Sequence, residues 1–230
     1  MIHLRFAIKQ TIPIFFAYVF LGIAFGIMMA EANYSILTTI CSSVFIYAGS
    51  MQIAMVPLLK AGAPFGVLAI MAFFINARHI FYGVGFIDKF RKSGWRYPYL
   101  VFALTDETYS ILCSIEYPES IDEHQANFLI AILNQSYWIL GSFLGVCAGR
   151  FLPFDLSGIE FSATAFFLVV VLNQLKQYKS KIPVLTGLIC ALFFLIVLGP
   201  EYFIIPALSA SFIALILLRT VVSKKMEVSE

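Results

Sequence analysis

Residues 12–30 of the chain read IPIFFAYVFLGIAFGIMMA, a run without a charged side chain. A helix needs about 20 apolar residues to cross the ~30 Å hydrocarbon layer of a bilayer, so this run predicts a membrane-spanning helix. Arg5 and Lys9 precede it, which is also the charge pattern of a secretory signal peptide. The run is longer than the ~7–15 residue core of a signal peptide, and this favours a retained membrane helix.

The composition of the whole chain extends this prediction. Of its 230 residues, 61% are hydrophobic and 12% are charged, and the mean hydropathy is +0.92. A soluble domain has about a quarter of its residues charged, so a soluble enzyme is a poor hypothesis. The net charge is only +2, and the basic residues lie in short clusters at the ends of apolar runs. We therefore expect a protein of the lipid bilayer with no nucleic-acid partner.

The apolar residues are grouped into stretches separated by short polar breaks. Each stretch approaches the length that a membrane helix requires. The eight stretches are 12–30, 36–59, 64–87, 99–115, 125–149, 161–175, 182–199 and 202–218. The expected fold class is therefore all-α, a polytopic membrane protein with a single membrane domain.

The two halves of the chain resemble each other weakly. A shift of about 120 residues lays Phe73-Phe74 on Phe193-Phe194 and aligns two Gly-x-x-x-Gly motifs. Several matches in the same order predict an internal duplication, with repeats at 1–118 and 119–230.

The basic clusters predict how the chain is threaded through the membrane. They lie near residues 5–9, 89–96, 176–181 and 219–225. Lys and Arg in short loops favour the cytoplasmic side. All four clusters and both termini are cytoplasmic if 36–59 and 161–175 are re-entrant, which leaves six full crossings. The halves would then form an inverted repeat with discontinuous segments, while seven or eight crossings remain the alternatives.

Two neighbouring apolar stretches carry costly polar side chains. The first contains Asn76, Arg78, His79 and Tyr82 about nine residues before its loop, close to mid-bilayer. An Arg there costs roughly 2.5–3.5 kcal/mol on insertion scales, so it is expected to find a partner. Asn76, His79 and Tyr82 share one helical face, with Arg78 about 100° round from His79.

The next stretch carries the adjacent carboxyl groups of Asp106 and Glu107. Either one of them is protonated, or both pair with Arg78 and His79. An ion pair that only pins two helices together is the structural alternative. Four ionisable groups exceed what pinning requires, and this favours a substrate or proton pathway.

Weaker candidates lie in the re-entrant stretches. Gly49 and Ser50 mark a break in 36–59, and Gln52 follows it. Overlaying the halves brings Gln52 near Asn173, so both amides would line the same cavity or, alternatively, bond across helices. The Gly-x-x-x-Gly motifs at 22–26 and 141–145 predict close helix contacts.

Motifs for other chemistry do not occur. The cysteines show no C-x-x-C spacing, and the chain has neither a Walker A sequence nor H-E-x-x-H. His79 with Glu107 has no Ser or Cys nucleophile beside it in sequence. The sequence thus predicts no metal site and no cofactor, and it does not favour an enzyme.

Three runs are similar to those of a known family: residues 45–52 (FIYAGSMQ), 76–83 (NARHIFYG) and 105–109 (TDETY). With them the chain resembles, over essentially its whole length, the large permease subunit of the AzlC family of branched-chain amino acid exporters. The resemblance implies export of branched-chain amino acids from bacterial cells across the cytoplasmic (inner) membrane. It also implies a small membrane partner of the AzlD type.

A zwitterionic substrate requires two opposite charges and an apolar pocket. The hypothesis is that Asp106 or Glu107 faces the ammonium group, while Arg78 or backbone amides at the Gly49-Ser50 break face the carboxylate. Such a pocket distinguishes one methylene by only ~1–3 kcal/mol, so methionine is expected among the substrates. Proton exchange through His79 and the two carboxyl groups is the simplest energy source. A passive channel, or a scaffold subunit whose partner carries the transport site, is the alternative.

Overall fold

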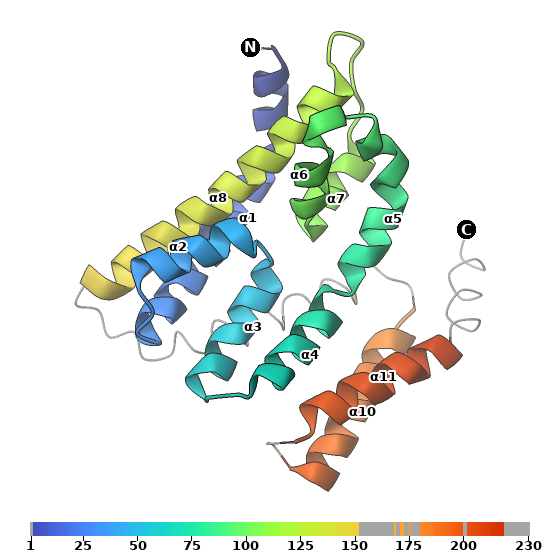
Figure 1. Cartoon of the computed structure of the whole chain (residues 1–230). Coiled ribbons are helices and arrows are strands. Elements are labelled where there is room, and N and C mark those ends of the chain that lie inside the picture. Colours follow the sequence, from blue (N-terminus) through green and yellow to red (C-terminus); the bar gives the residue numbers. More distant parts are fainter. Residues whose placement is uncertain are drawn as a thin grey trace. The chain divides into compact units, whose positions relative to one another are not determined.

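The computed structural model describes residues 2–151, 180–199 and 202–218, together with 168, 171, 172 and 175. Within these ranges every regular element is a helix, which confirms the all-α class (Figure 1). The helices are α1 (Ile2–Glu31), α2 (Ile36–Phe45), α3 (Gly49–Lys60), α4 (Phe65–Asn76), α5 (Arg78–Arg91), the 3-10 helix η1 (Gly94–Arg96), α6 (Tyr97–Phe102), α7 (Asp106–Ser114), α8 (Glu123–Phe151), α10 (Ile182–Leu198) and α11 (Ile204–Leu217). The predicted re-entrant stretch 161–175 falls largely outside the described residues, and Asn173 lies outside them.

The chain forms two compact units, each described here by itself. The first comprises Met1–Ala63 and Ile75–Glu160, and the second comprises Pro64–Phe74 and Phe161–Glu230. In the second unit α10 packs against α11, and Phe74 of α4 makes an edge-on ring contact with Phe212 of α11 at 6.0 Å. All the site residues discussed below that the structure describes belong to the first unit.

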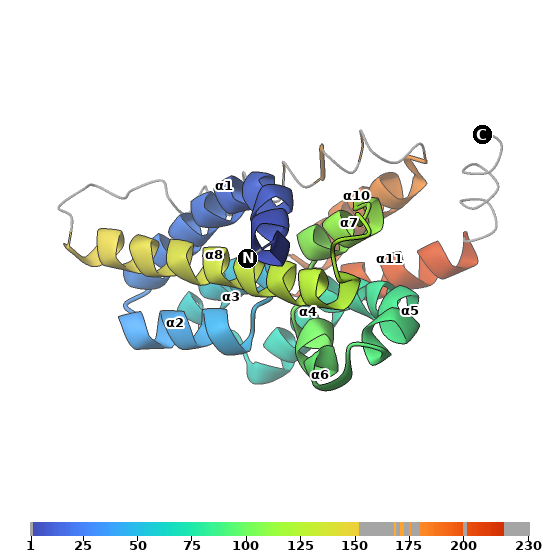
Figure 2. The same ribbon diagram turned by 90° about the horizontal axis from the view of Figure 1, so that it is seen from above.

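Helices α1 and α8 are the two uninterrupted membrane helices among the described residues. They pack along much of their length, and Figures 1 and 2 show α8 also in contact with α2. A Cβ added at Gly141 would lie 2.6 Å from the carbonyl oxygen of Val19, and one at Gly149 would lie 2.8 Å from the Cβ of Ala30. The contacting residues advance together along both helices, so α1 and α8 run parallel.

Both Gly-x-x-x-Gly motifs lie at this contact. A Cβ at Gly22 would lie 2.9 Å from the backbone nitrogen of Ser142, and one at Gly26 would lie 2.5 Å from that of Val146. Only glycine lets two helix backbones approach this closely. The predicted close helix contacts are therefore confirmed.

The stretch 36–59 is broken into α2 and α3, as predicted. The break covers residues 46–48, and Tyr47 adopts a positive φ of 44°. A bulky residue in this region is uncommon and needs support from its surroundings. Tyr47 is buried, and its ring lies 6.4 Å from that of Tyr18 on α1.

The two ends of this broken stretch lie near the same ends of α1 and α8. Before α2, the carbonyl of Tyr34 accepts a hydrogen bond from Arg150 at the C-terminal end of α8 (2.7 Å). At the break, Tyr47 reaches Tyr18 near the middle of α1. After α3, Lys60 returns to the C-terminal end of α1, where both border a common pocket. Both ends of the α2–α3 segment thus lie near the C-terminal ends of α1 and α8, which supports a re-entrant course; that course stays a prediction.

The stretch 99–115 is also broken, although we predicted a full crossing. Helix α6 ends at Phe102, and α7 begins after Thr105, whose side chain accepts a hydrogen bond from the backbone N–H of Thr108. Ser and Thr are preferred N-cap residues because their oxygen satisfies an N–H group that has no partner within the helix. The carboxyl groups of Asp106 and Glu107 then lie in the first turn of α7.

Both ends of the α6–α7 segment lie near the N-terminal part of α8. Before α6, Trp95 packs against the N-terminal part of α8. At the break, Thr105 forms a 2.7 Å hydrogen bond with Tyr18. After α7, Tyr117 returns to the start of α8 and donates to the side-chain oxygen of Asn127 (2.6 Å). Burial raises the pKa of this Tyr117 phenol, which keeps it a neutral donor.

The acidic loop 116–124 therefore lies beside the basic cluster near 89–96, not across the membrane from it as we predicted. Lys89 forms an ion pair with Glu123, and Ser93 hydrogen-bonds His124 at 3.0 Å. The error came from treating 99–115 as one span because its length and hydropathy sufficed. The polar break at the centre of this stretch divides it into two helices, each of which is too short to cross a bilayer.

The parallel course of α1 and α8 bears on the predicted inverted repeat. Inverted repeats orient corresponding helices in opposite directions. Helices α1 and α8, which correspond in the sequence overlay, run in the same direction, so the inverted relation does not hold for this pair. The division into repeats 1–118 and 119–230 stays a prediction.

Candidate functional site

The tips of the two re-entrant segments meet at mid-depth. The ring of Tyr47 lies 6.3 Å from that of Phe102, and both tips approach Tyr18 near the middle of α1. Trp138, near the middle of α8, packs edge-on against Tyr18 at 5.7 Å. Two helices, α3 and α7, therefore begin inside the protein, with their first N–H groups near its centre.

An ion pair connects the start of α5 to the start of α7. Nη1 of Arg78 lies 2.8 Å from Oδ2 of Asp106, and the side chains are 29% and 31% exposed. The other guanidinium nitrogen, Nη2, donates to Oγ of Ser50 in the first turn of α3 (2.9 Å). The planar guanidinium thus links three helices, which fits the expected pairing of Arg78 with a carboxylate.

His79 approaches the same carboxylate without bonding it. Its Nε2 lies 3.9 Å from Oδ1 of Asp106, while Nδ1 is 3.0 Å from the carbonyl oxygen of Asn76. If Nδ1 donates to that carbonyl, Nε2 is the ring nitrogen that faces Asp106. Oδ1 of Asp106 and Nε of Arg78 are buried without a hydrogen-bond partner. The ion pair therefore keeps unused donor and acceptor capacity.

Glu107 points elsewhere. Its Oε2 accepts a 2.6 Å hydrogen bond from the hydroxyl of Tyr18, which also lies 2.7 Å from Oγ1 of Thr105. Of the two alternatives for the carboxyl groups, pairing with Arg78 therefore holds for Asp106 alone, and His79 lies 3.9 Å from the same carboxylate. The adjacent carboxyl groups face different partners because neighbouring helix positions are about 100° apart.

A cavity of about 220 Å³ lies where the broken ends converge. It is large for a water site, since an engineered cavity of ~150 Å³ accommodates benzene. Most of its lining is apolar, while Asn76, His79 and Thr105 contribute polar groups. The lining residues are Ile46, Tyr47, Ala48, Asn76, His79, Gly83, Val101, Phe102, Leu104 and Thr105. His79 thus lies both in the lining of this cavity and beside the Arg78–Asp106 ion pair.

Gln52 is fully buried and bonded to protein. Its Oε1 accepts from Nε1 of Trp138 (3.1 Å) and from the backbone N–H of Ala48 (3.2 Å), and its Nε2 donates to Ser42 (3.2 Å). Its amide thus fixes the break between α2 and α3 against α8. This is the structural alternative stated for Gln52, and its predicted partner Asn173 lies outside the described residues.

Gly49 and Tyr82 have steric and aromatic roles. A Cβ at Gly49 would lie 3.1 Å from the ring of Trp138, so this position keeps the start of α3 close to α8. The ring of Tyr82 stacks on Tyr109 of α7 at 4.5 Å and lies 6.0 Å from that of His79. Tyr82 therefore packs α5 against α7.

Sequence reasoning missed three residues of this site: Tyr18, Thr105 and Trp138. Tyr18 and Trp138 sit in apolar runs, and nothing local indicates partners about 90 positions away. Thr105 was detectable, because a Thr followed by two acidic residues is a helix-start signal.

Comparisons with known proteins identify relatives of the chain. Residues 13–152 match the model of the family described as AzlC protein. The branched-chain amino acid transport protein AzlC of Bacillus subtilis is 37% identical, over 98% of this chain and 87% of the relative. An uncharacterized membrane protein of Helicobacter pylori strain J99 is 37% identical over 93% of both chains, and the inner membrane protein YgaZ of Escherichia coli is 26% identical over 75% and 73%.

No solved structure matches the chain significantly. The family match covers both re-entrant segments, and the relative from Bacillus subtilis aligns over nearly the whole length. The chain therefore belongs to the AzlC protein family.

Proposed function

We propose that the chain exports branched-chain amino acids, and other apolar amino acids such as methionine, across the bacterial cytoplasmic membrane in exchange for protons. The name of the Bacillus subtilis relative supports the substrate class. The single observation that carries the proposal is the Arg78–Asp106 ion pair beside an apolar cavity at mid-depth.

An internal ion pair matches a zwitterion in charge. The substrate carboxylate takes the place of Asp106 at the Arg78 guanidinium, and the substrate ammonium takes the place of Arg78 at Asp106. No charge is left without a partner in this exchange, which avoids the several kcal/mol that an isolated buried charge costs. The 220 Å³ cavity receives the apolar side chain.

Two groups next to the ion pair supply a proton route. His79 lies 3.9 Å from Asp106, and Glu107 binds Tyr18 instead of a cation. Proton binding to these groups changes the net charge of the site, so the site with and without substrate would hold different numbers of protons. Such linkage is the physical basis of exchange.

The same proposal includes a small membrane subunit of the AzlD type. The resemblance of the chain to the large subunit of a two-component exporter supports it. The transport measurements therefore use the chain co-expressed with that subunit, the chain alone and the subunit alone. Transport by the partner without this chain would assign this chain a scaffold role and contradict the proposal.

The test is leucine export from cells and counterflow in proteoliposomes. Asp106→Asn and Arg78→Gln each leave one charge unmatched, and each is expected to reduce export at least tenfold, about 1.4 kcal/mol. Lys89→Gln is the matched control, because it removes the cation of another ion pair in the same unit. Full activity of Asp106→Asn, or leucine flux that does not saturate, would contradict a carrier of this kind.

Proton exchange has its own measurement. Glu107→Gln is expected to retain leucine counterflow, which requires only substrate exchange, and to lose leucine flux driven by a pH gradient. His79→Gln is expected to lower gradient-driven flux as well. Unchanged gradient-driven flux in both variants would rule out these groups as the proton route.

A further inference from the structure

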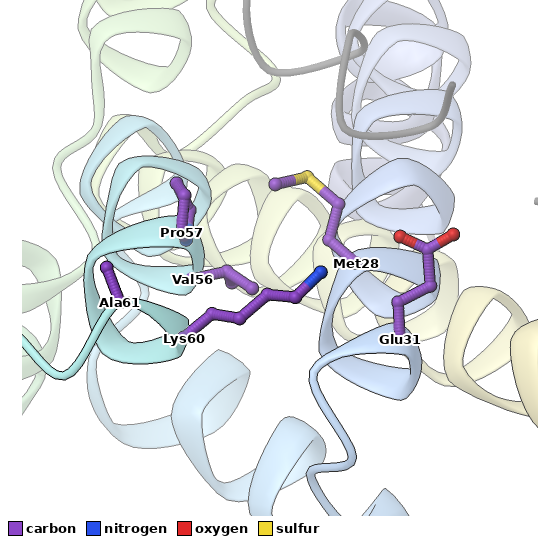
Figure 3. A pocket seen from close by; sticks show the side chains of 6 residues that line it. All are labelled: Met28, Glu31, Val56, Pro57, Lys60 and Ala61. Carbon is purple, nitrogen blue, oxygen red and sulfur yellow. The ribbon is translucent and has the colours of Figure 1, made fainter. Parts of the chain in front are cut away.

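A second cavity, separate from the ion pair, lies between the C-terminal ends of α1 and α3. Its volume is about 310 Å³. Figure 3 shows the Lys60 side chain extending from α3 toward α1, where Met28 and Glu31 lie. Both contributing helices belong to the first unit.

The lining combines two opposite charges with apolar side chains. Met28 and Val56 are 5% and 3% exposed, and Pro57 and Ala61 complete the apolar wall. Glu31 and Lys60 contribute one charge of each sign to the lining, so the cavity has no net formal charge. A carboxylate, an ammonium group and a dry wall are the three features that an apolar amino acid requires.

Helix α3 connects this cavity with the central site. Its first turn holds Ser50, the hydrogen-bond acceptor of Arg78, and its last turn holds Lys60. These positions are roughly 15 Å apart at 1.5 Å per residue. Helix α3 therefore has one end at the central ion pair and the other end at this cavity.

The side of the membrane follows from the re-entrant course of α2–α3. Lys60 lies at the C-terminal end of α1, whereas the basic cluster near 89–96 lies at the start of α8, and α1 and α8 run parallel. Since basic clusters favour the cytoplasm, we expect the Lys60 end to face outward.

We propose that the cavity formed by Met28, Glu31, Val56, Pro57, Lys60 and Ala61 is a second binding site for zwitterionic apolar amino acids, which the substrate occupies on the outer side of the membrane. Glu31 binds the ammonium group, and Lys60 binds the carboxylate. This inference rests on the proposed function, because it names an outer station of the same transport path.

The test is protection of a single cysteine. Ala61→Cys is introduced into a chain whose four cysteines are replaced by serine, and intact cells are treated with a membrane-impermeant thiol reagent. Millimolar leucine is expected to slow labelling at least threefold. Leucinamide, which lacks the carboxylate, and 4-methylpentanoate, which lacks the ammonium group, are expected to protect much less.

Matched controls separate the site from general effects. Ser35→Cys lies in the exposed loop before α2, outside the cavity, so it should be labelled without protection. Glu31→Gln and Lys60→Gln are each expected to raise the protecting leucine concentration about tenfold. Arg150→Gln removes a cation at the same end outside the cavity and should leave protection unchanged.

Leucine export from the same cells distinguishes the two proposals. Export without protection at position 61, or equal protection by leucinamide and leucine, would overturn the second site. Labelling from the cytoplasmic side alone would do the same. Protection without any export would retain this binding site and contradict the proposed transport.

Discussion

The α1–α8 pair and the two re-entrant segments use opposite solutions to the same constraint. In lipid every backbone polar group needs a partner within the protein, and an uninterrupted helix supplies it by itself. Helices α1 and α8 therefore need only glycines that let them pack closely. The α2–α3 and α6–α7 segments break at mid-depth, and their breaks require Gln52 and Thr105 to satisfy backbone N–H groups. The uninterrupted helices α1 and α8 form the frame of the first unit, and the broken segments contribute polar residues of the candidate site.

The largest expected effect is on the frame. Gly141→Leu adds a side chain at a position where even a Cβ would lie 2.6 Å from the carbonyl oxygen of Val19. The atoms it would meet belong to the backbone of α1, which cannot rotate away as a side chain can. We expect a loss of more than about 3 kcal/mol of stability and little folded protein. Thermal unfolding in detergent, followed by size-exclusion chromatography, measures this. Gly187→Ala is the control, because its Cβ meets nothing within 4 Å.

The second effect tests whether the first break depends on one amide. Gln52→Leu keeps the volume and leaves Nε1 of Trp138 and the N–H of Ala48 without their acceptor. Each unsatisfied buried donor costs about 1–3 kcal/mol, so we expect a loss of about 3 kcal/mol. Gln52→Glu, which retains the acceptor oxygen, should recover much of it. Equal unfolding temperatures for Gln52→Leu and the parent would mean that the break holds itself.

The same contrast between uninterrupted and broken helices explains which parts of the fold could be predicted from the sequence. Uninterrupted spans and the glycine contacts follow from local hydropathy and spacing, and both were predicted. The α2–α3 break was predicted because Gly49-Ser50 interrupts the pattern. The α6–α7 break was missed because its segment is apolar enough to span. Averaged hydropathy does not detect a cap such as Thr105.

The candidate site divides in a similar way. Arg78 and Asp106 were predicted because charges in apolar runs are expensive and must pair. The hydrogen bond between Glu107 and Tyr18 was not predicted. A tyrosine within an apolar run has no large free-energy cost of insertion, so nothing in the sequence indicates that it needs a partner. Long-range neutral partners therefore depend on tertiary structure, whereas charged partners follow from energetics.

A smaller effect is expected at Tyr18, which connects α1 to the first turn of α7. Tyr18→Phe removes the hydrogen bonds to Glu107 and Thr105 and preserves the ring contacts with Trp138. We expect a loss of about 1–2 kcal/mol in stability. If Glu107 carries the proton, the pH at which gradient-driven leucine flux is half-maximal should also shift, whereas counterflow should not change. A shift in neither quantity would make the Tyr18–Glu107 contact a packing feature.

The smallest expected effect isolates the link between the two segments. Ser50→Ala removes the 2.9 Å hydrogen bond from Nη2 of Arg78 and leaves the 2.8 Å contact with Asp106. Because Arg78 keeps its charge partner, stability should fall by only about 0.5–1 kcal/mol. The guanidinium would no longer be fixed to the start of α3, so the leucine concentration giving half-maximal counterflow should rise a few-fold with little change in maximal rate. Ser50→Thr, which keeps the hydroxyl, should behave as the parent. A fall in maximal rate at unchanged affinity would instead mean that Ser50 serves the movement of α3 and not the placement of the charge.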